Sequence, residues 1–258
     1  MDVFDFMAVY TFVFGLVLGS FLNVCIYRIP LKKSIIRPAS SCPQCGQKIR
    51  FYDNIPVISY LILMGRCRNC HHPISWQYPV VELATGLLSL ALFIRYDLSF
   101  QYGVFFLFMV LLLIISFIDL HHQLIPDVLS LPGMVAGFAS VFLLHHISWL
   151  ASLLGLFIGY ASFYLIAVGF KYATGKEGMG LGDAKLLGMI GAWMGWKALI
   201  PVVMMSSLTG AVIGTAALLL ARKGLRVRIP FGPFLSMGAM VYFFFGPQLL
   251  RWYLNLFM

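Results

Sequence analysis

Long runs of apolar residues, separated by short polar segments, dominate the sequence. A helix that crosses the hydrocarbon core of a membrane, about 30 Å thick, needs roughly 20 consecutive apolar residues. The pattern therefore predicts an all-α polytopic membrane protein with about eight transmembrane helices. The predicted spans are residues 6–27, 79–95, 101–119, 128–145, 149–170, 184–197, 198–221 and 231–250. The sixth lies between Lys185 and Lys197, and we expect it to be short or tilted.

The composition agrees with this pattern and excludes a soluble globular protein. Of the 258 residues, 61% are hydrophobic and 10% are charged, and the mean hydropathy is +0.92. A soluble domain carries roughly 25% charged residues. In a soluble protein the extra apolar residues would have no core to fill. The same composition also excludes a disordered chain and a disulfide-rich secreted domain.

The distribution of charge predicts how the chain is oriented. The net charge is +9, but the lysines and arginines lie in short clusters between apolar runs, so we expect no nucleic-acid partner. If the N-terminus faces outward, 15 of the 18 lysines and arginines fall in cytoplasmic segments. The other three are Arg95, Lys197 and Arg251. Such a bias is the signature of cytoplasmic loops. We therefore expect residues 30–78 and 222–230 to face the cytoplasm.

The polar stretch at 30–78 contains four of the five cysteines and predicts a metal site. Cys42-Pro-Gln-Cys45 is followed, after 21 residues, by Cys67-Arg-Asn-Cys70. Two CxxC pairs bring four thiolates to one tetrahedral point, which suits a structural Zn²⁺ ion. Structural disulfides are disfavoured in the reducing cytoplasm. We expect three parts: a first transmembrane helix at 1–29, a zinc-binding domain at 30–78 and a transmembrane domain at 79–258.

A second interpretation exists for one of the cysteine pairs. Cys67-Arg-Asn-Cys70-His71 matches the CxxCH signature of covalent haem attachment. Haem attachment belongs outside the cytoplasmic membrane and would leave Cys42 and Cys45 without a role, so zinc is favoured.

Two aspartates at the predicted cytoplasmic ends of spans are candidates for catalysis. Asp119 directly follows the apolar run 111–118, and Asp183 follows Gly178-Met-Gly180-Leu-Gly182. Ionisable groups at membrane depth are costly and are therefore functional candidates. The common metalloprotease and serine-hydrolase motifs are absent from the sequence. If the protein is a hydrolase, these two carboxylates are its best-supported catalytic groups.

Several neighbouring residues have candidate supporting roles. Gly180 and Gly182 would allow a close backbone approach beside Asp183. Asp127 follows Pro126 and precedes an apolar run, so we favour a helix N-cap, with support of the active site as the alternative. Glu82 is expected in the first turn of its helix, where it would complement the helix dipole. A transporter or channel is the alternative function, but it would place acids in mid-span.

The sequence resembles the bacterial type IV prepilin peptidases, a family of GxGD aspartyl membrane proteases. Five features carry the resemblance, from about residue 15 to Pro233. They are Asp119-Leu-His-His-Gln-Leu-Ile-Pro126-Asp127, Lys176-Glu-Gly-Met-Gly180-Leu-Gly182-Asp183-Ala-Lys185, Gly19-Ser-Phe-Leu-Asn-Val with Arg28-Ile-Pro30, the paired CxxC motifs and Pro79-Val-Val-Glu82-Leu.

The resemblance implies a bifunctional enzyme of the bacterial inner membrane with its active site facing the cytoplasm. Such enzymes remove the basic leader of type IV prepilins and pseudopilins after a glycine. Many then methylate the new N-terminal amine with S-adenosylmethionine. The catalytic pair corresponds to Asp119 and Asp183, and Lys185 is a supporting residue of the same motif. No G-x-G-x-x-G signature is present, so methyl transfer rests on the resemblance alone.

Overall fold

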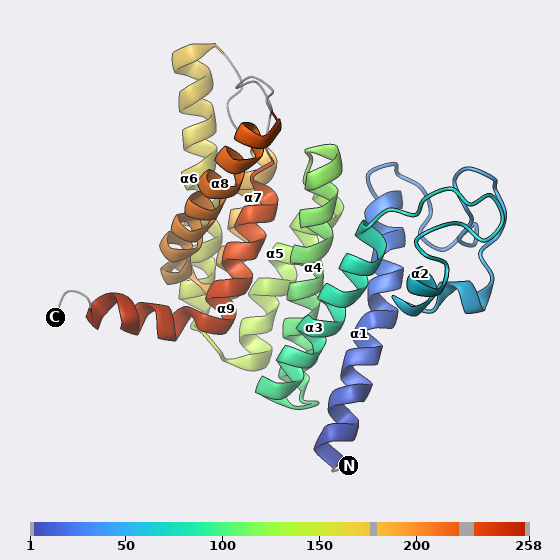
Figure 1. Ribbon diagram of the computed structural model, residues 1–258. Helices are drawn as coiled ribbons and strands as arrows, with labels where there is room; N and C mark the ends of the chain where they lie inside the picture. The colour runs from blue at the N-terminus through green and yellow to red at the C-terminus, as the bar shows by residue number, and fades with distance from the viewer. Residues whose placement is uncertain (1–2, 176–179, 222–229, 256–258) are drawn as a thin grey trace. The chain divides into compact units, whose positions relative to one another are not determined.

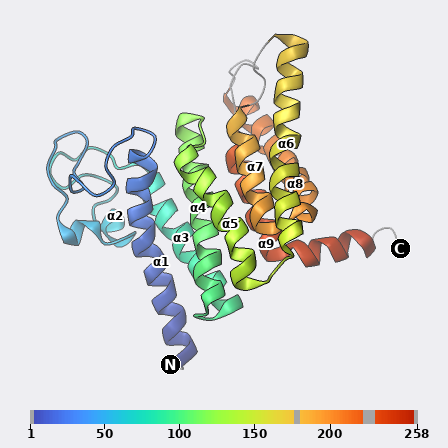
Figure 2. The ribbon, with the colours of Figure 1, turned by 180° about the vertical axis from the view of Figure 1, so that it is seen from behind.

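The computed structural model describes residues 3–175, 180–221 and 230–255, and the regular structure in these ranges is helical, which confirms the all-α prediction. Figures 1 and 2 show the helices from opposite sides. They are α1 (Val3–Arg28), the 3-10 helix η1 (Phe51–Asn54), α2 (Ile58–Ile62), α3 (Gln77–Tyr96), α4 (Phe100–His122), α5 (Asp127–Leu144), α6 (Trp149–Thr174), α7 (Leu181–Met194), the 3-10 helix η2 (Trp196–Ala198), α8 (Leu199–Ala221) and α9 (Gly232–Asn255).

Helices lie at all eight positions that the apolar pattern predicts. Among the described residues, α1, α3, α4, α5, α6 and the segment Trp196–Ala216 are long and apolar enough to cross a membrane. Helix α7 has 14 residues, so it extends only about 21 Å at 1.5 Å per residue. It is the short sixth helix expected from the sequence. Helix α9 contains Pro247 and bends part-way along its length (Figure 1).

The chain forms two compact units, Met1–Ile114 and Ile115–Met258, and their boundary lies within α4. In the first unit, α1 packs closely along α3 because glycines face α3. A Cβ atom on Gly15 would lie 2.7 Å from the Cα atom of Gly86. Only a residue without a side chain permits such an approach, which brings many atoms of both helices into van der Waals contact.

In the second unit, α7 is enclosed by α5 and α6. A Cβ atom on Gly155 of α6 would lie 2.2 Å from the carbonyl oxygen of Gly191 in α7. The indole of Trp193, which is buried, donates from Nε1 to the carbonyl of Gly133 in α5 at 2.9 Å. Ser152 of α6 donates to the carbonyl of Ala192 at 2.6 Å. These contacts fix the position of α7, which carries Asp183 near its start.

Candidate active site and metal centre

The two CxxC segments adopt the same backbone structure. The amide of Cys42 donates to the carbonyl of Gln47 at 2.9 Å, and the amide of Cys67 donates to the carbonyl of His72 at 2.9 Å. An isolated antiparallel bridge closes each segment, Ser41 with Lys48 and Arg66 with Pro73. The residue after the second cysteine has a positive φ in both, 69° at Gly46 and 55° at His71. His71 therefore occupies the position that a glycine takes in the first segment.

The four cysteines that the sequence predicts as ligands come together. The sulfur atoms of Cys42, Cys45, Cys67 and Cys70 all lie within 4.8 Å of one another, and those of Cys42 and Cys70 are 3.8 Å apart. Tetrahedral Zn–S bonds of about 2.3 Å place sulfur atoms about 3.8 Å apart. The cluster thus has the donor set and the spacing for one metal ion. Cys25, the fifth cysteine, is buried in α1 as expected.

Polar contacts hold the loop around the cysteines to its neighbours. Arg68, between Cys67 and Cys70, binds both carboxylate oxygens of Asp53 in η1, with Nη2–Oδ1 at 2.6 Å and Nε–Oδ2 at 2.9 Å. The guanidinium group lowers the pKa of Asp53. The amide of Val57 donates to the buried carboxylate of Glu82 in α3 at 2.8 Å. Glu82 is the sixth residue of α3, so its predicted first-turn role is wrong, and it holds the loop instead.

Asp119 lies in the last turn of α4 and is buried, with 5% of its surface exposed. Its Oδ2 atom accepts a hydrogen bond of 3.0 Å from the backbone amide of Gly232, the first residue of α9. A Cβ atom on Gly232 would lie 2.6 Å from the same oxygen. The carboxylate therefore fits against this backbone only because residue 232 has no side chain.

Asp183 is the third residue of α7 and lies near Asp119. Burial, and then the negative charge of Asp119, raise the pKa of Asp183 to about 7. Asp183 lies outside the membrane-spanning segments. It precedes the predicted span 184–197, and α7, with 14 residues, is not among the helices long enough to cross a membrane. The structure thus brings together the two carboxylates that the sequence singled out. Two interacting carboxyl groups of this kind share one proton near neutral pH.

The residues beside Asp183 fasten the start of α7 to the start of α5. A Cβ atom on Gly182 would lie 3.0 Å from Cβ of Ile125, so the predicted close approach is confirmed there. Lys185 forms an ion pair with Asp127, with Nζ–Oδ1 at 2.5 Å. The N-cap of α5 is Pro126 and Asp127 is the first helical residue, without a capping hydrogen bond. The favoured capping role of Asp127 is therefore wrong, because its carboxylate turns to Lys185.

The other residues that the sequence singled out near the two aspartates have no close contact, are exposed or lie outside the described residues. Gly180 has a φ of −73°, which any residue can adopt, and among the described residues a Cβ atom there would meet nothing closer than 3.9 Å. The described residues therefore make no close approach to Gly180. His121 and His122, next to Asp119, are exposed. Gly178 and Glu177 lie outside the described residues.

Sequence reasoning missed Gly232. The available signal was a glycine within Phe231-Gly-Pro-Phe234 at the start of the last apolar run. Helix initiation does not require a glycine at position 232. Its presence there indicates instead a close contact with another part of the chain. Nothing in the pattern, however, identified Asp119 as the contacting residue.

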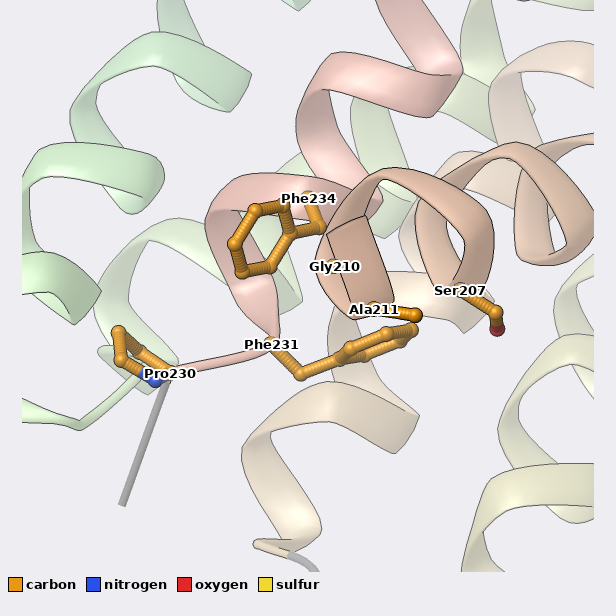
Figure 3. A pocket seen from close by; sticks show the side chains of 6 residues that line it. All are labelled: Ser207, Gly210, Ala211, Pro230, Phe231 and Phe234. Carbon is orange, nitrogen blue, oxygen red and sulfur yellow. The ribbon is translucent and has the colours of Figure 1, made fainter. Parts of the chain in front are cut away.

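A pocket of about 270 Å³ lies beside this glycine, between α8 and the start of α9. Figure 3 shows the ring of Phe231 beside Ala211 and that of Phe234 near Gly210, both on α8. Pro230 and Ser207 complete the lining. Among the residues that the structure describes, no side chain of the lining is charged.

Comparison with known proteins places the chain in a family. The profile of the bacterial peptidase A24 N-terminal domain matches residues 13–96, and that of the type IV leader peptidase family matches residues 106–215. A prepilin leader peptidase/N-methyltransferase of Pseudomonas aeruginosa is 39% identical, over 95% of this chain and 92% of its own length. The chain belongs to the type IV leader peptidase family.

Other relatives agree with this assignment to the leader peptidases. A protein of the same name from Aeromonas hydrophila is 38% identical, over 96% of this chain and 93% of its own length. Another, from Stutzerimonas stutzeri, is 39% identical over 94% and 92%. No solved structure matches the chain. The family assignment does not support the transporter alternative, and Asp119 lies at a helix end rather than in mid-span.

Proposed function

We propose that the protein is a prepilin leader peptidase that also methylates the new N-terminus, acting on type IV prepilins or pseudopilins. The observation that supports it is the pairing of Asp119 with Asp183 in a chain whose relatives carry the name prepilin leader peptidase/N-methyltransferase. The methylation half of this proposal rests on that name, with S-adenosylmethionine as the methyl donor.

The proposed mechanism follows from the shared proton. Asp119, held by the Gly232 amide, acts as the ionised carboxylate and takes a proton from water, which attacks the scissile carbonyl. Asp183, whose raised pKa favours the protonated form, donates a hydrogen bond to the carbonyl oxygen. It then helps to protonate the leaving amine. Lys185 and Gly182 position Asp183 through their contacts with Asp127 and Ile125.

The four-cysteine cluster is proposed to hold a structural Zn²⁺ ion. Four thiolates fill the tetrahedral coordination sphere and leave no open position for a substrate. The ion would therefore supply cross-linking to a loop whose exposed apolar residues, such as Phe51 and Met64, form no core of their own. The haem alternative loses support because His71 takes a turn position that Gly46 takes in the other segment.

The enzyme is proposed to lie in the bacterial inner membrane with its aspartates at the cytoplasmic side. The arginines and lysines of residues 30–78 support this orientation. The apolar segment of a prepilin could then remain in lipid while its basic leader reaches the cytoplasm. A membrane-impermeant thiol reagent added outside should label a cysteine engineered at position 147 and spare one at position 35. The reverse result would overturn the orientation.

The decisive experiment incubates the purified protein with a purified prepilin and reads the product by intact mass. Leader loss and methyl gain are separate mass changes, so the two activities are scored independently. Cleavage without added S-adenosylmethionine, followed by methylation when it is added, is the expected result. An intact prepilin after prolonged incubation with folded enzyme would overturn the peptidase assignment.

A further inference from the structure

The short helix α2 turns its apolar face outward and its polar face toward the protein. Ile58, Leu61 and Ile62 are spaced i, i+3 and i+4, so they share one face of the helix. Of their surfaces, 54%, 67% and 68% are exposed. Ser59 is buried, and its hydroxyl donates to the carbonyl of Tyr52 at 2.9 Å. A helix at the surface of a water-soluble domain has the reverse arrangement, so the surroundings of α2 are expected to be apolar.

A contact with α3 fixes the level of α2 along the membrane-spanning helices. The amide of Val57, directly before α2, donates to Oε2 of Glu82 at 2.8 Å. Glu82 is the sixth residue of α3, so it lies about 7.5 Å along the helix from its start. Val57 has a φ of 60°, which β-branched residues rarely adopt, so the surrounding structure maintains this turn at an energetic cost. Helix α2 therefore begins beside the second turn of a helix long and apolar enough to cross a membrane.

Two aromatic residues lie at the same level. The ring centroid of Tyr60 in α2 is 5.9 Å from that of Trp76, the residue before α3, and Trp76 is largely exposed. The amide of Ile74 donates to the carbonyl of Gly65 at 2.7 Å, which joins the end of α2 to the segment that enters α3. Tryptophan and tyrosine are enriched where a membrane meets water, because their rings are apolar and carry one polar group. Their pairing beside the start of α3 is typical of a segment in that interface.

The charges of the surrounding loop complement an anionic surface. Residues 30–78 contain one acidic residue, Asp53, whose carboxylate is bound by Arg68. The same range contains seven basic residues, all exposed, which are Lys32, Lys33, Arg37, Lys48, Arg50, Arg66 and Arg68. Clusters of roughly four to eight lysines and arginines next to a membrane-spanning helix bind anionic phospholipid headgroups. The basic leader of a prepilin would be repelled by this loop, so the loop fits a lipid surface better than a leader.

We propose that α2 anchors the cysteine loop to the bilayer surface. Ile58, Leu61 and Ile62 insert among the acyl chains at the face where α1 ends and α3 begins. The surrounding lysines and arginines bind anionic phospholipid headgroups at the same face. Transfer of the apolar side chains from water to lipid stabilises the inserted position, and the four cysteines are thereby held next to the membrane. The anchor involves neither aspartate and does not depend on the proposed peptidase function.

The test places a photoreactive benzoylphenylalanine at position 61 of the full-length protein, in bilayers that contain phosphatidylglycerol. After irradiation, intact mass should show a phospholipid adduct. The same probe in place of Leu87, an exposed residue of α3 within its candidate span, is the positive control. In place of Gln47, an exposed polar residue of the first CxxC segment, it should give a severalfold lower yield. Equal yields at positions 61 and 47, or no lipid adduct at 61, would overturn the anchor.

A second probe position and a second lipid complete the experiment. The probe in place of Ile62, on the same face of α2, should give the same adduct as at position 61. In bilayers of phosphatidylcholine alone the yield at both positions should fall severalfold, because the headgroup attraction is lost, and free phosphate should not restore it. A yield that does not depend on lipid charge would overturn the role of the basic residues. An adduct with added prepilin that replaces the lipid adduct would make this surface a protein-docking site and overturn the lipid assignment.

Discussion

The ammonium group of Lys185, the fifth residue of α7, lies 2.5 Å from Oδ1 of Asp127, the first residue of α5, and so links the two helices. Asp183 lies between this ion pair and the close contact of Gly182 with Ile125. The ion pair of Lys185 and the close contact of Gly182 thus hold the start of α7, which carries the candidate catalytic carboxylate of Asp183. The pair is partly exposed, 25% for Lys185 and 59% for Asp127, so its contribution to stability is about 0–1 kcal/mol.

Breaking this ion pair should therefore affect cleavage more than folding. Lys185→Met and Asp127→Asn should each lower kcat for prepilin cleavage several-fold, with nearly wild-type amounts in the membrane. Because the two residues are in contact, a double-mutant cycle should give a coupling of about 1 kcal/mol. Lys185→Arg, which keeps the charge, should recover part of the rate. Additive effects of the two substitutions would show that the pair does not act as a unit.

Cleavage should require an ionisable carboxyl group at both Asp119 and Asp183. Asp119→Asn and Asp183→Asn should each abolish cleavage, because asparagine keeps the shape but cannot take up or release the shared proton. Both proteins should remain in the membrane and still methylate a substrate supplied without its leader, since methyl transfer needs no carboxylate pair. Intact mass distinguishes the two outcomes. Full cleavage by either variant would contradict the aspartyl mechanism.

The raised pKa of Asp183 sets the pH range for cleavage. Burial and the charge of Asp119 raise this pKa to about 7, so the proton is held below that pH and lost above it. The value of kcat/KM reports groups of the free enzyme and should fall as the pH rises through about 7. Methyl transfer, measured in the same samples, should not follow this profile. A peptidase rate that stays constant from pH 6 to 9 would argue against a proton on Asp183.

Sequence pattern predicted most of this architecture because the bilayer imposes it. The apolar runs predicted α1, α3 and α4 within a few residues, and two charged ends predicted that α7 is short. The cysteine cluster was predictable because CxxC spacing already places two sulfur atoms on one turn. The partners of Asp119 and Asp127 were not predictable. Gly232 and Lys185 are distant along the chain, and only the packing of α9 and α7 brings them near.

Removal of the metal should unfold the cysteine loop and leave the helices intact. The purified protein should contain about one zinc per chain, and Cys42→Ser should lower that occupancy, since the loop folds around the ion. Cys25→Ser is the matched control, because Cys25 is buried in α1 and is not part of the cluster. Its zinc content should be that of the wild type. Proteolysis within residues 30–78 should accelerate only in the metal-depleted protein. A zinc-free protein with a protease-resistant loop would contradict the structural role.

The contact of Gly232 with Asp119 predicts that adding a single methyl group at position 232 impairs cleavage. In Gly232→Ala the new Cβ atom would lie 2.6 Å from Oδ2 of Asp119, so the carboxylate must move. A displacement of about 1 Å at a catalytic group can lower the rate on the order of 100-fold, and we expect a loss of that size in kcat. The loss should appear in cleavage and spare methylation of a substrate that already lacks its leader.

The control for this substitution is Gly169→Ala in α6, where a Cβ atom would meet no heavy atom of the described residues within 4 Å. It replaces glycine by a better helix former and should leave cleavage at the wild-type rate. If Gly232→Ala also cleaves at that rate, the carboxylate has room to move without consequence, and the amide of Gly232 does not determine where Asp119 acts. If instead both activities disappear together, the substitution has disturbed the packing of α9 rather than the position of one oxygen atom.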